Sequence, residues 1–182
     1  MTTTSNRPAE TLSERQSNSM APGDMTKRGI VLLVGAVAIL LLVKEIGPLD
    51  YYWNPLLVGV AFLAAAAVTG PRSPLWGAGL VVGFWGVSKV FQNNTDFAWA
   101  GSATTAMIGV GGLVGAYLVT RGFAISVASV AFPVVFIGLG QYIHSTFEGW
   151  PITGYTAGLA AVYGIAELVN ASRVRNKLGA GA

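Results

Sequence analysis

Six apolar segments, each about 18 to 22 residues long, follow one another along this chain of 182 residues. Each is long enough to cross the roughly 30 Å hydrocarbon layer of a bilayer as an α-helix. Glycine and proline mark the joins, and the segments do not alternate apolar and polar residues as membrane β-strands do. The segments lie near 29–47, 53–70, 75–92, 100–120, 122–143 and 152–172. The pattern predicts an all-α membrane protein with six transmembrane helices.

The composition agrees with a membrane protein and narrows the chemistry. The chain is 53% hydrophobic and 10% charged, whereas a soluble domain has about 25% charged residues. It has no cysteine and a single histidine, which excludes disulfides, thiolate nucleophiles and metal sites built from several histidines. Hydrolase, metalloprotease, phosphate-binding and dinucleotide motifs are absent. We therefore expect no enzymatic activity, no cofactor and no metal.

The charged residues divide the chain into a membrane domain and two tails. Residues 1–28 are polar without apolar periodicity, which predicts a disordered tail; residues 29–172 form the six-helix domain, and 173–182 a short basic tail. Because lysine and arginine are enriched in cytoplasmic loops, we expect both tails in the cytoplasm and the domain in the inner or plasma membrane. This charge reflects topology and not nucleic-acid binding. One side of the predicted spans carries Arg15, Lys27, Arg28, Arg72, Arg121, Arg173, Arg175 and Lys177, and the other carries Lys44 and Lys89.

An acidic residue followed by a tryptophan recurs at three predicted outer turns. The stretches are LDYYW at 49–53, TDFAW at 95–99 and FEGW at 147–150. Two explanations stay open. One helical hairpin was repeated three times, as 29–70, 75–120 and 122–172, or two spans and two turns simply take about 50 residues while interfaces attract tryptophan.

These hairpins resemble the HdeD-type short-repeat family of bacterial membrane proteins. The resemblance lies in LLVGAVAILLLVKEIGP (32–48), LLVGVAFLAAAA (56–67) and GLVVGFWGVSKV (79–90). It implies six spans in three hairpins, cytoplasmic ends and an association with acid stress. The stretch GFWGVSKVFQNNTD (83–96) is also similar to amide and urea channels of the AmiS/UreI type. That second resemblance implies outward-facing termini, opposite to the charge bias.

Small and polar residues form a stripe on each of the last three predicted spans. Such residues let membrane helices pack closely or associate as homo-oligomers, and glycine pairs at 79/83, 111/115 and 154/158 have the required spacing. The alternative is a path for a solute or protons through the bundle. The candidate buried or conduit residues are Ser102, Thr105, Ser126, Ser129, Thr156, Tyr163, Glu167 and Asn170.

Glu167 is the strongest single candidate, because an ionised carboxylate inside a membrane pairs, lines water or carries function. Its stripe predicts that the side chain points at other helices. Arg121 and Arg72 belong to the same predicted membrane side and are the expected partners. At the other side, His144 and Glu148 are one helical turn apart and form a candidate pH-sensitive pair.

Two functions follow from these features. The first is a non-enzymatic membrane protein with a structural or stress-associated role, and the second is a channel or transporter for a small solute. An accessory subunit of a larger membrane complex is a third alternative. In each case the expected partner is the lipid bilayer.

Overall fold

A computed structural model describes residues 21–43, 46–96, 100–147, 149 and 151–179. Within these ranges the chain is helical, apart from its turns and an isolated bridge between Val43 and Leu49. The elements are α2 (Pro22–Leu42), the 3-10 helix η1 (Tyr51–Trp53), α3 (Asn54–Ala67), α4 (Leu75–Asn94), α5 (Ala100–Thr120), α6 (Val127–Thr146) and α7 (Ile152–Gly179). The all-α prediction is confirmed for the described residues.

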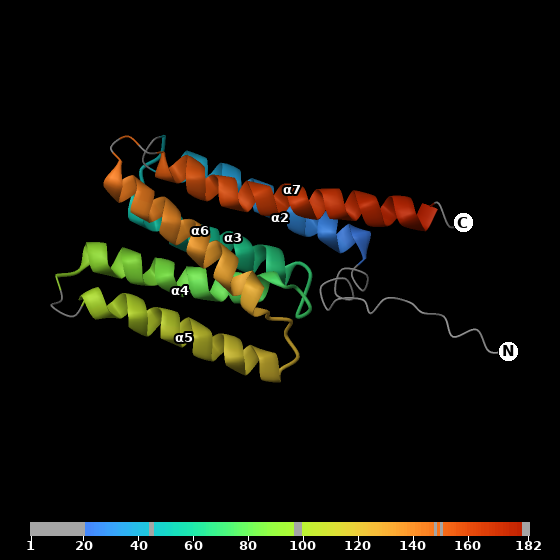
Figure 1. The fold of residues 1–182 in the computed structure, drawn as a ribbon, viewed down its shortest axis with the longest axis horizontal. Coiled ribbons are helices and arrows are strands. Elements are labelled where there is room, and N and C mark those ends of the chain that lie inside the picture. The colour runs from blue at the N-terminus through green and yellow to red at the C-terminus, as the bar shows by residue number, and fades with distance from the viewer. Residues whose placement is uncertain (1–20, 44–45, 97–99, 148, 150, 180–182) are drawn as a thin grey trace.

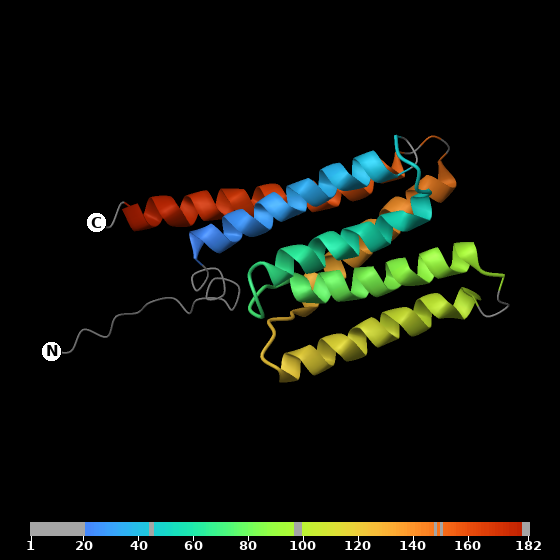
Figure 2. The same ribbon diagram turned by 180° about the vertical axis from the view of Figure 1, so that it is seen from behind.

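The helices run up and down, so the turns gather at two ends of the molecule (Figures 1 and 2). We call the end at which α2 begins and α7 ends the terminal end, and the opposite end the far end. Gly70 and Gly122 reverse the chain at the terminal end with φ of 80° and 82°, a conformation that glycine adopts without steric cost.

The charges of the described residues follow this alternation. Asp50, Asp96 and Lys89 belong to the far end. The terminal end carries Lys27, Arg28, Arg72, Arg121, Arg173, Arg175 and Lys177. Seven basic residues therefore gather at the terminal end, where the described acidic residues are Asp24 and Glu167.

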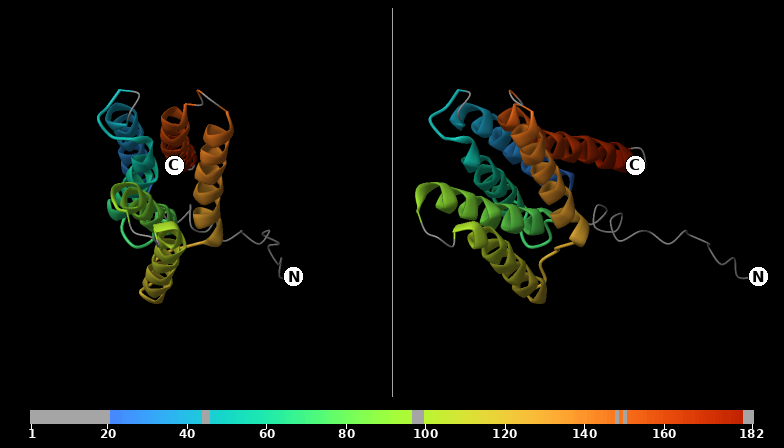
Figure 3. Two further views of the ribbon diagram at one scale, coloured as in Figure 1. Left: turned by 90° about the vertical axis from the view of Figure 1, so that its left-hand side faces the viewer. Right: turned by 60° about the vertical axis from the view of Figure 1, so that its left-hand side comes forward.

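The first and last helices pack together along much of α2 (Figure 1). Next to them α3 packs between α2 and α4, and α5 lies against α4 at one edge. The sixth helix, α6, crosses both α4 and α7, so that it meets α7 over a shorter stretch than α5 meets α4 (Figure 3). The threefold repeat stays a prediction, and Trp99, Glu148 and Trp150, three of its marker residues, lie outside the described residues.

Glycines set the closest approach between α3 and α4. A Cβ atom at Gly59 would lie 2.3 Å from the Cα of Gly83, and one at Gly86 would lie 2.1 Å from the nitrogen of Leu56. Gly79 shares this close packing, since a Cβ there would lie 2.8 Å from Cγ of Leu63, and the backbone of Gly83 is the surface that Gly59 meets. Gly154 and Gly158 make no such close approach within the bundle, because a Cβ on Gly154 would make only an ordinary contact and one on Gly158 would meet nothing within 4 Å.

Three described helices are long and apolar enough to cross a membrane: α2, the 102–120 part of α5, and α7. The second predicted span is shorter than expected, since α3 has 14 residues and ends where Gly70 and Pro71 turn the chain. At about 1.5 Å per residue, 14 residues extend about 21 Å. Many large apolar side chains face outward, among them Leu113 at 73% and Val135 at 67% exposure.

The boundary between tail and domain also differs from the prediction. Helix α2 begins at Pro22, so residues 22–28 are helical and not part of a disordered tail. Proline in the first turn and Asp24 beside it are features of helix starts, because the first turn has unsatisfied N–H groups and a positive dipole end. This correction matters for the site, because it puts Arg28 on a helix.

Candidate functional site

Two glycines bring α2 and α7 into contact. A Cβ atom at Gly29 would lie 2.9 Å from the carbonyl oxygen of Gly164, and one at Gly164 would lie 3.0 Å from that of Gly29. Leu33 and Leu168 pack on either side of this crossing. Small residues permit such close approach between membrane helices. Here the crossing places Arg28, just before Gly29, near Glu167, three residues after Gly164.

An ion pair lies directly beside this crossing. Nη2 of Arg28, on α2, donates to Oε2 of Glu167, on α7. The Arg28 side chain is 3% exposed and the Glu167 side chain 14% exposed. Separating the two charges would leave a buried charge without its counter-charge, which is costly even though burying the pair itself costs desolvation energy. The pair therefore fixes the relative position of the first and last helices.

The prediction for Glu167 was right in direction and wrong in partner. Its side chain points at another helix, as its stripe indicates, but neither expected arginine pairs with it. Arg121 is exposed and donates from Nε and Nη2 to the hydroxyl of Tyr117, at 3.0 and 2.7 Å. Arg72 lies exposed in the turn between α3 and α4. The true partner, Arg28, stands in sequence at the border of the assumed tail.

The polar stripes on α5 and α6 do not meet in a common interior. Ser102 and Thr105 are exposed on α5, which lies at the edge of the bundle. Ser126 and Ser129 form a reciprocal cap at the start of α6, in which the Ser129 N–H donates to Oγ of Ser126 at 3.2 Å. Within the bundle these residues lie at a helix start and on an outer face.

The remaining stripe residues of α7 have separate surroundings. Thr156 is buried, and its hydroxyl lies 3.0 Å from the carbonyl oxygen of Ile152. Tyr163 packs its ring against Phe62 and Phe132, with centroids 5.2 and 5.8 Å away. Asn170 is exposed. Only Glu167 makes a charged contact with another helix.

A polar contact between α4 and α5 is not indicated by any sequence pattern. Nε2 of Gln92 donates to Oγ1 of Thr104 at 2.6 Å, and Oγ of Ser88 lies 3.2 Å from the same atom. Thr104 was overlooked because it lies beside the predicted stripe. These groups satisfy one another and tie α5 to α4.

The candidate pH-sensitive pair lies partly outside the described residues, which do not include Glu148. His144 is half-buried near the end of α6, and its ring lies 5.5 Å from that of Tyr51. Across the described part of the chain, no three histidine, aspartate or glutamate side chains gather where they could hold a metal ion.

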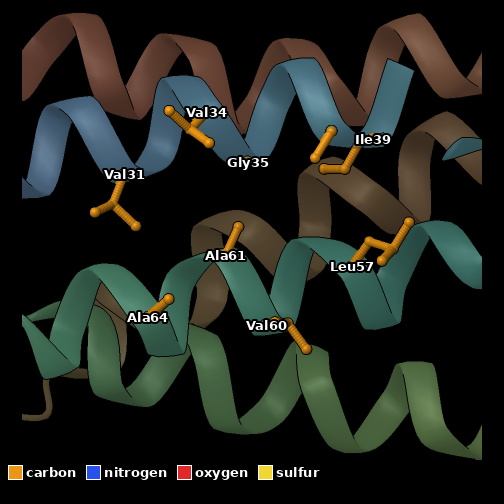
Figure 4. Close-up of a pocket in the computed structure, with 9 residues that line it drawn as sticks. Val31, Val34, Gly35, Ile39, Leu57, Val60, Ala61 and Ala64 are labelled. Carbon is orange, nitrogen blue, oxygen red and sulfur yellow. The ribbon is translucent and has the colours of Figure 1, made fainter. Parts of the chain in front are cut away.

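A groove of about 220 Å³ runs between α2 and α3 (Figure 4). Gly35 and Ala61 form its floor, since a Cβ on Gly35 would lie 2.6 Å from that of Ala61. The groove is lined by Val31, Val34, Gly35, Ala38, Ile39, Leu57, Val60, Ala61 and Ala64. These side chains offer no hydrogen bond to a polar solute, so the groove suits hydrocarbon.

Comparisons with protein-family models, with curated proteins and with solved structures found no match.

Proposed function

We propose that this chain is a multi-pass protein of the inner or plasma membrane. Its role is non-enzymatic and either structural or stress-associated, the second being what the HdeD-type resemblance implies. The observation that carries the proposal is the buried ion pair between Arg28 and Glu167. In this pair Glu167, the strongest candidate for a functional charge in the apolar region, joins α7 to α2. A carboxylate used in this way is not presented to a solute.

Two further observations support this choice over a channel. The polar residues expected to line a path on α5 and α6 are exposed or cap a helix. The groove between α2 and α3 is apolar throughout. Large apolar side chains also face outward along α2, α5, α6 and α7, which supports a membrane location for either function.

A flux measurement separates the two functions. The purified protein is reconstituted into liposomes, and the permeation of protons, urea and small amides is compared with that of protein-free liposomes. We expect equal rates, because the stripes do not form a continuous polar lining. A rate that rises in proportion to the amount of protein would contradict the structural role and favour a channel.

We further propose six spans with both termini in the cytoplasm, supported by the basic terminal end. Single cysteines at Asn94 and Ser145, exposed at the far end, are expected to react with an impermeant thiol reagent in intact cells. Cysteines at Thr120 and Ser172, exposed toward the terminal end, are expected to react only after permeabilisation. The natural chain has no cysteine and supplies the blank. Labelling of the Thr120 variant in intact cells would overturn the orientation.

A further inference from the structure

Two polar side chains are buried at the far end without partners. Asn54, the first residue of α3, is 1% exposed, and Thr153, near the start of α7, is 0% exposed. Among the described residues, no hydrogen bond reaches Nδ2 or Oδ1 of Asn54 or Oγ1 of Thr153. A buried polar group that lacks a hydrogen bond costs about 1–3 kcal/mol, so native proteins pair such groups with protein atoms or with ordered water.

The two residues lie at the same level of neighbouring helices. Helices α3 and α7 both start at the far end and run in the same direction (Figures 1 and 2). The rings of Phe62 and Tyr163 meet between them, with centroids 5.2 Å apart. Asn54 precedes Phe62 by eight residues, which brings it level with the region between Thr153 and Thr156 on α7.

The face of α3 that carries Asn54 is directed toward α2. Successive residues of a helix are about 100° apart, so Asn54 and Ala61, seven residues later, differ by only about 20°. Ala61 meets Gly35 of α2. The opposite face, with Leu56 and Gly59, contacts α4. Asn54 therefore lies on the side of α3 that is covered by α2.

Thr153 lies on the matching face of α7. Gly164, eleven residues later, differs from it by about 20° on the same arithmetic, and Gly164 contacts Gly29 of α2. Both polar residues are thus on faces directed at α2. The antiparallel pairing of α2 with α7 brings the end of α2, where Val43 is fully buried, to their level.

We propose that Asn54 and Thr153 form a small polar binding site, between the starts of α3 and α7 and the end of α2, that holds internal water. The amide offers two donors and an acceptor, and the hydroxyl offers one donor and acceptor lone pairs. Thr156 adds an acceptor, since its own proton is directed to the backbone of its helix. Buried water typically makes about three hydrogen bonds, and these three side chains contain the donors and acceptors for them. The site does not depend on the function proposed above.

The test is hydroxyl-radical footprinting by X-ray irradiation of the full-length protein in nanodiscs, because radicals formed from internal water modify the side chains next to it. Val58, one turn after Asn54, and Val82 of α4 are both 0% exposed and form a matched pair. We expect Val58 to be modified several-fold faster than Val82. In the double variant Asn54→Leu/Thr153→Val this excess should disappear, while the control Ser88→Ala retains it.

Thermal stability gives a second readout. The double variant should melt within about 2–4 °C of the parent, the range that corresponds to about 1 kcal/mol for a chain of this size, whereas either single variant should melt lower because it leaves one polar group with fewer partners. Equal modification of Val58 and Val82 in the parent overturns the proposal, whether or not the variants fold. So does an excess at Val58 that survives in the double variant.

Discussion

Replacing Glu167 by glutamine is expected to lower the free energy of unfolding by about 3 kcal/mol, the lower end of the range for breaking a buried ion pair. Glutamine keeps the shape and one acceptor oxygen but removes the charge that faces Arg28, whose side chain is 3% exposed. The buried guanidinium then lacks a counter-charge on α7. The measurement is equilibrium unfolding in detergent micelles or nanodiscs.

Two control variants make this result specific. Arg121→Ala removes an exposed arginine at the same end of the molecule and should change stability by no more than about 0.5 kcal/mol. The double variant Arg28→Met/Glu167→Met should recover most of the loss, because apolar residues of similar volume remove the cost of desolvation together with the attraction. An effect of Glu167→Gln no larger than that of Arg121→Ala would mean that the pair does not hold the helices together.

The second large effect is expected at Gly59, where substitution by alanine should destabilise the protein by about 3 kcal/mol, at the upper end of the usual cost of overpacking. The new Cβ would lie 2.3 Å from the Cα of Gly83. This contact involves the backbone of α4, so a change of side-chain rotamer cannot relieve it. The two helices must separate, which weakens the packing along both.

The same interface supplies a matched control for Gly59→Ala. A Cβ at Gly83 would lie 3.8 Å from the Cα of Gly59, an ordinary contact, so Gly83→Ala should be tolerated. Gly158→Ala meets nothing within 4 Å and should stabilise α7 by up to about 1 kcal/mol, the difference in helix propensity between the two residues. The measurement is the melting temperature of the three variants in one detergent. Equal decreases in melting temperature for Gly59→Ala and Gly83→Ala would refute the packing of α3 on α4.

The helical fold and the direction of Glu167 could be predicted from sequence because both depend on local periodicity. Segment length and composition mark helices, and the spacing of Thr156, Tyr163 and Glu167 marks one face of α7. The partner of Glu167 could not be found in this way. Arg28 looks like a topology-determining charge at the end of a tail, and only the helix start at Pro22 and the Gly29–Gly164 crossing bring it to the carboxylate.

The polar stripes illustrate a different limit of sequence analysis. A small or polar residue has the same periodicity whether it faces a neighbouring helix, lipid or a path, so Ser102 and Thr105 could not be assigned to the outer face in advance. Asn54 was overlooked for a related reason. It stands at the start of the predicted span 53–70, between Trp53 and Pro55, and its burial follows from the way α2 covers the start of α3.

The pairing of the first helix with the last has a consequence for synthesis of the chain. Arg28 and Glu167 are separated by 139 positions. At a synthesis rate of about 5–20 residues per second, Arg28 emerges about 7–28 s before its counter-charge exists. During that interval α2 lacks the helix that covers it in the finished bundle. Until α7 is made, water or lipid headgroups must therefore solvate the guanidinium of Arg28 in place of Glu167, and a chain that stops before α7 leaves that charge without its counter-charge.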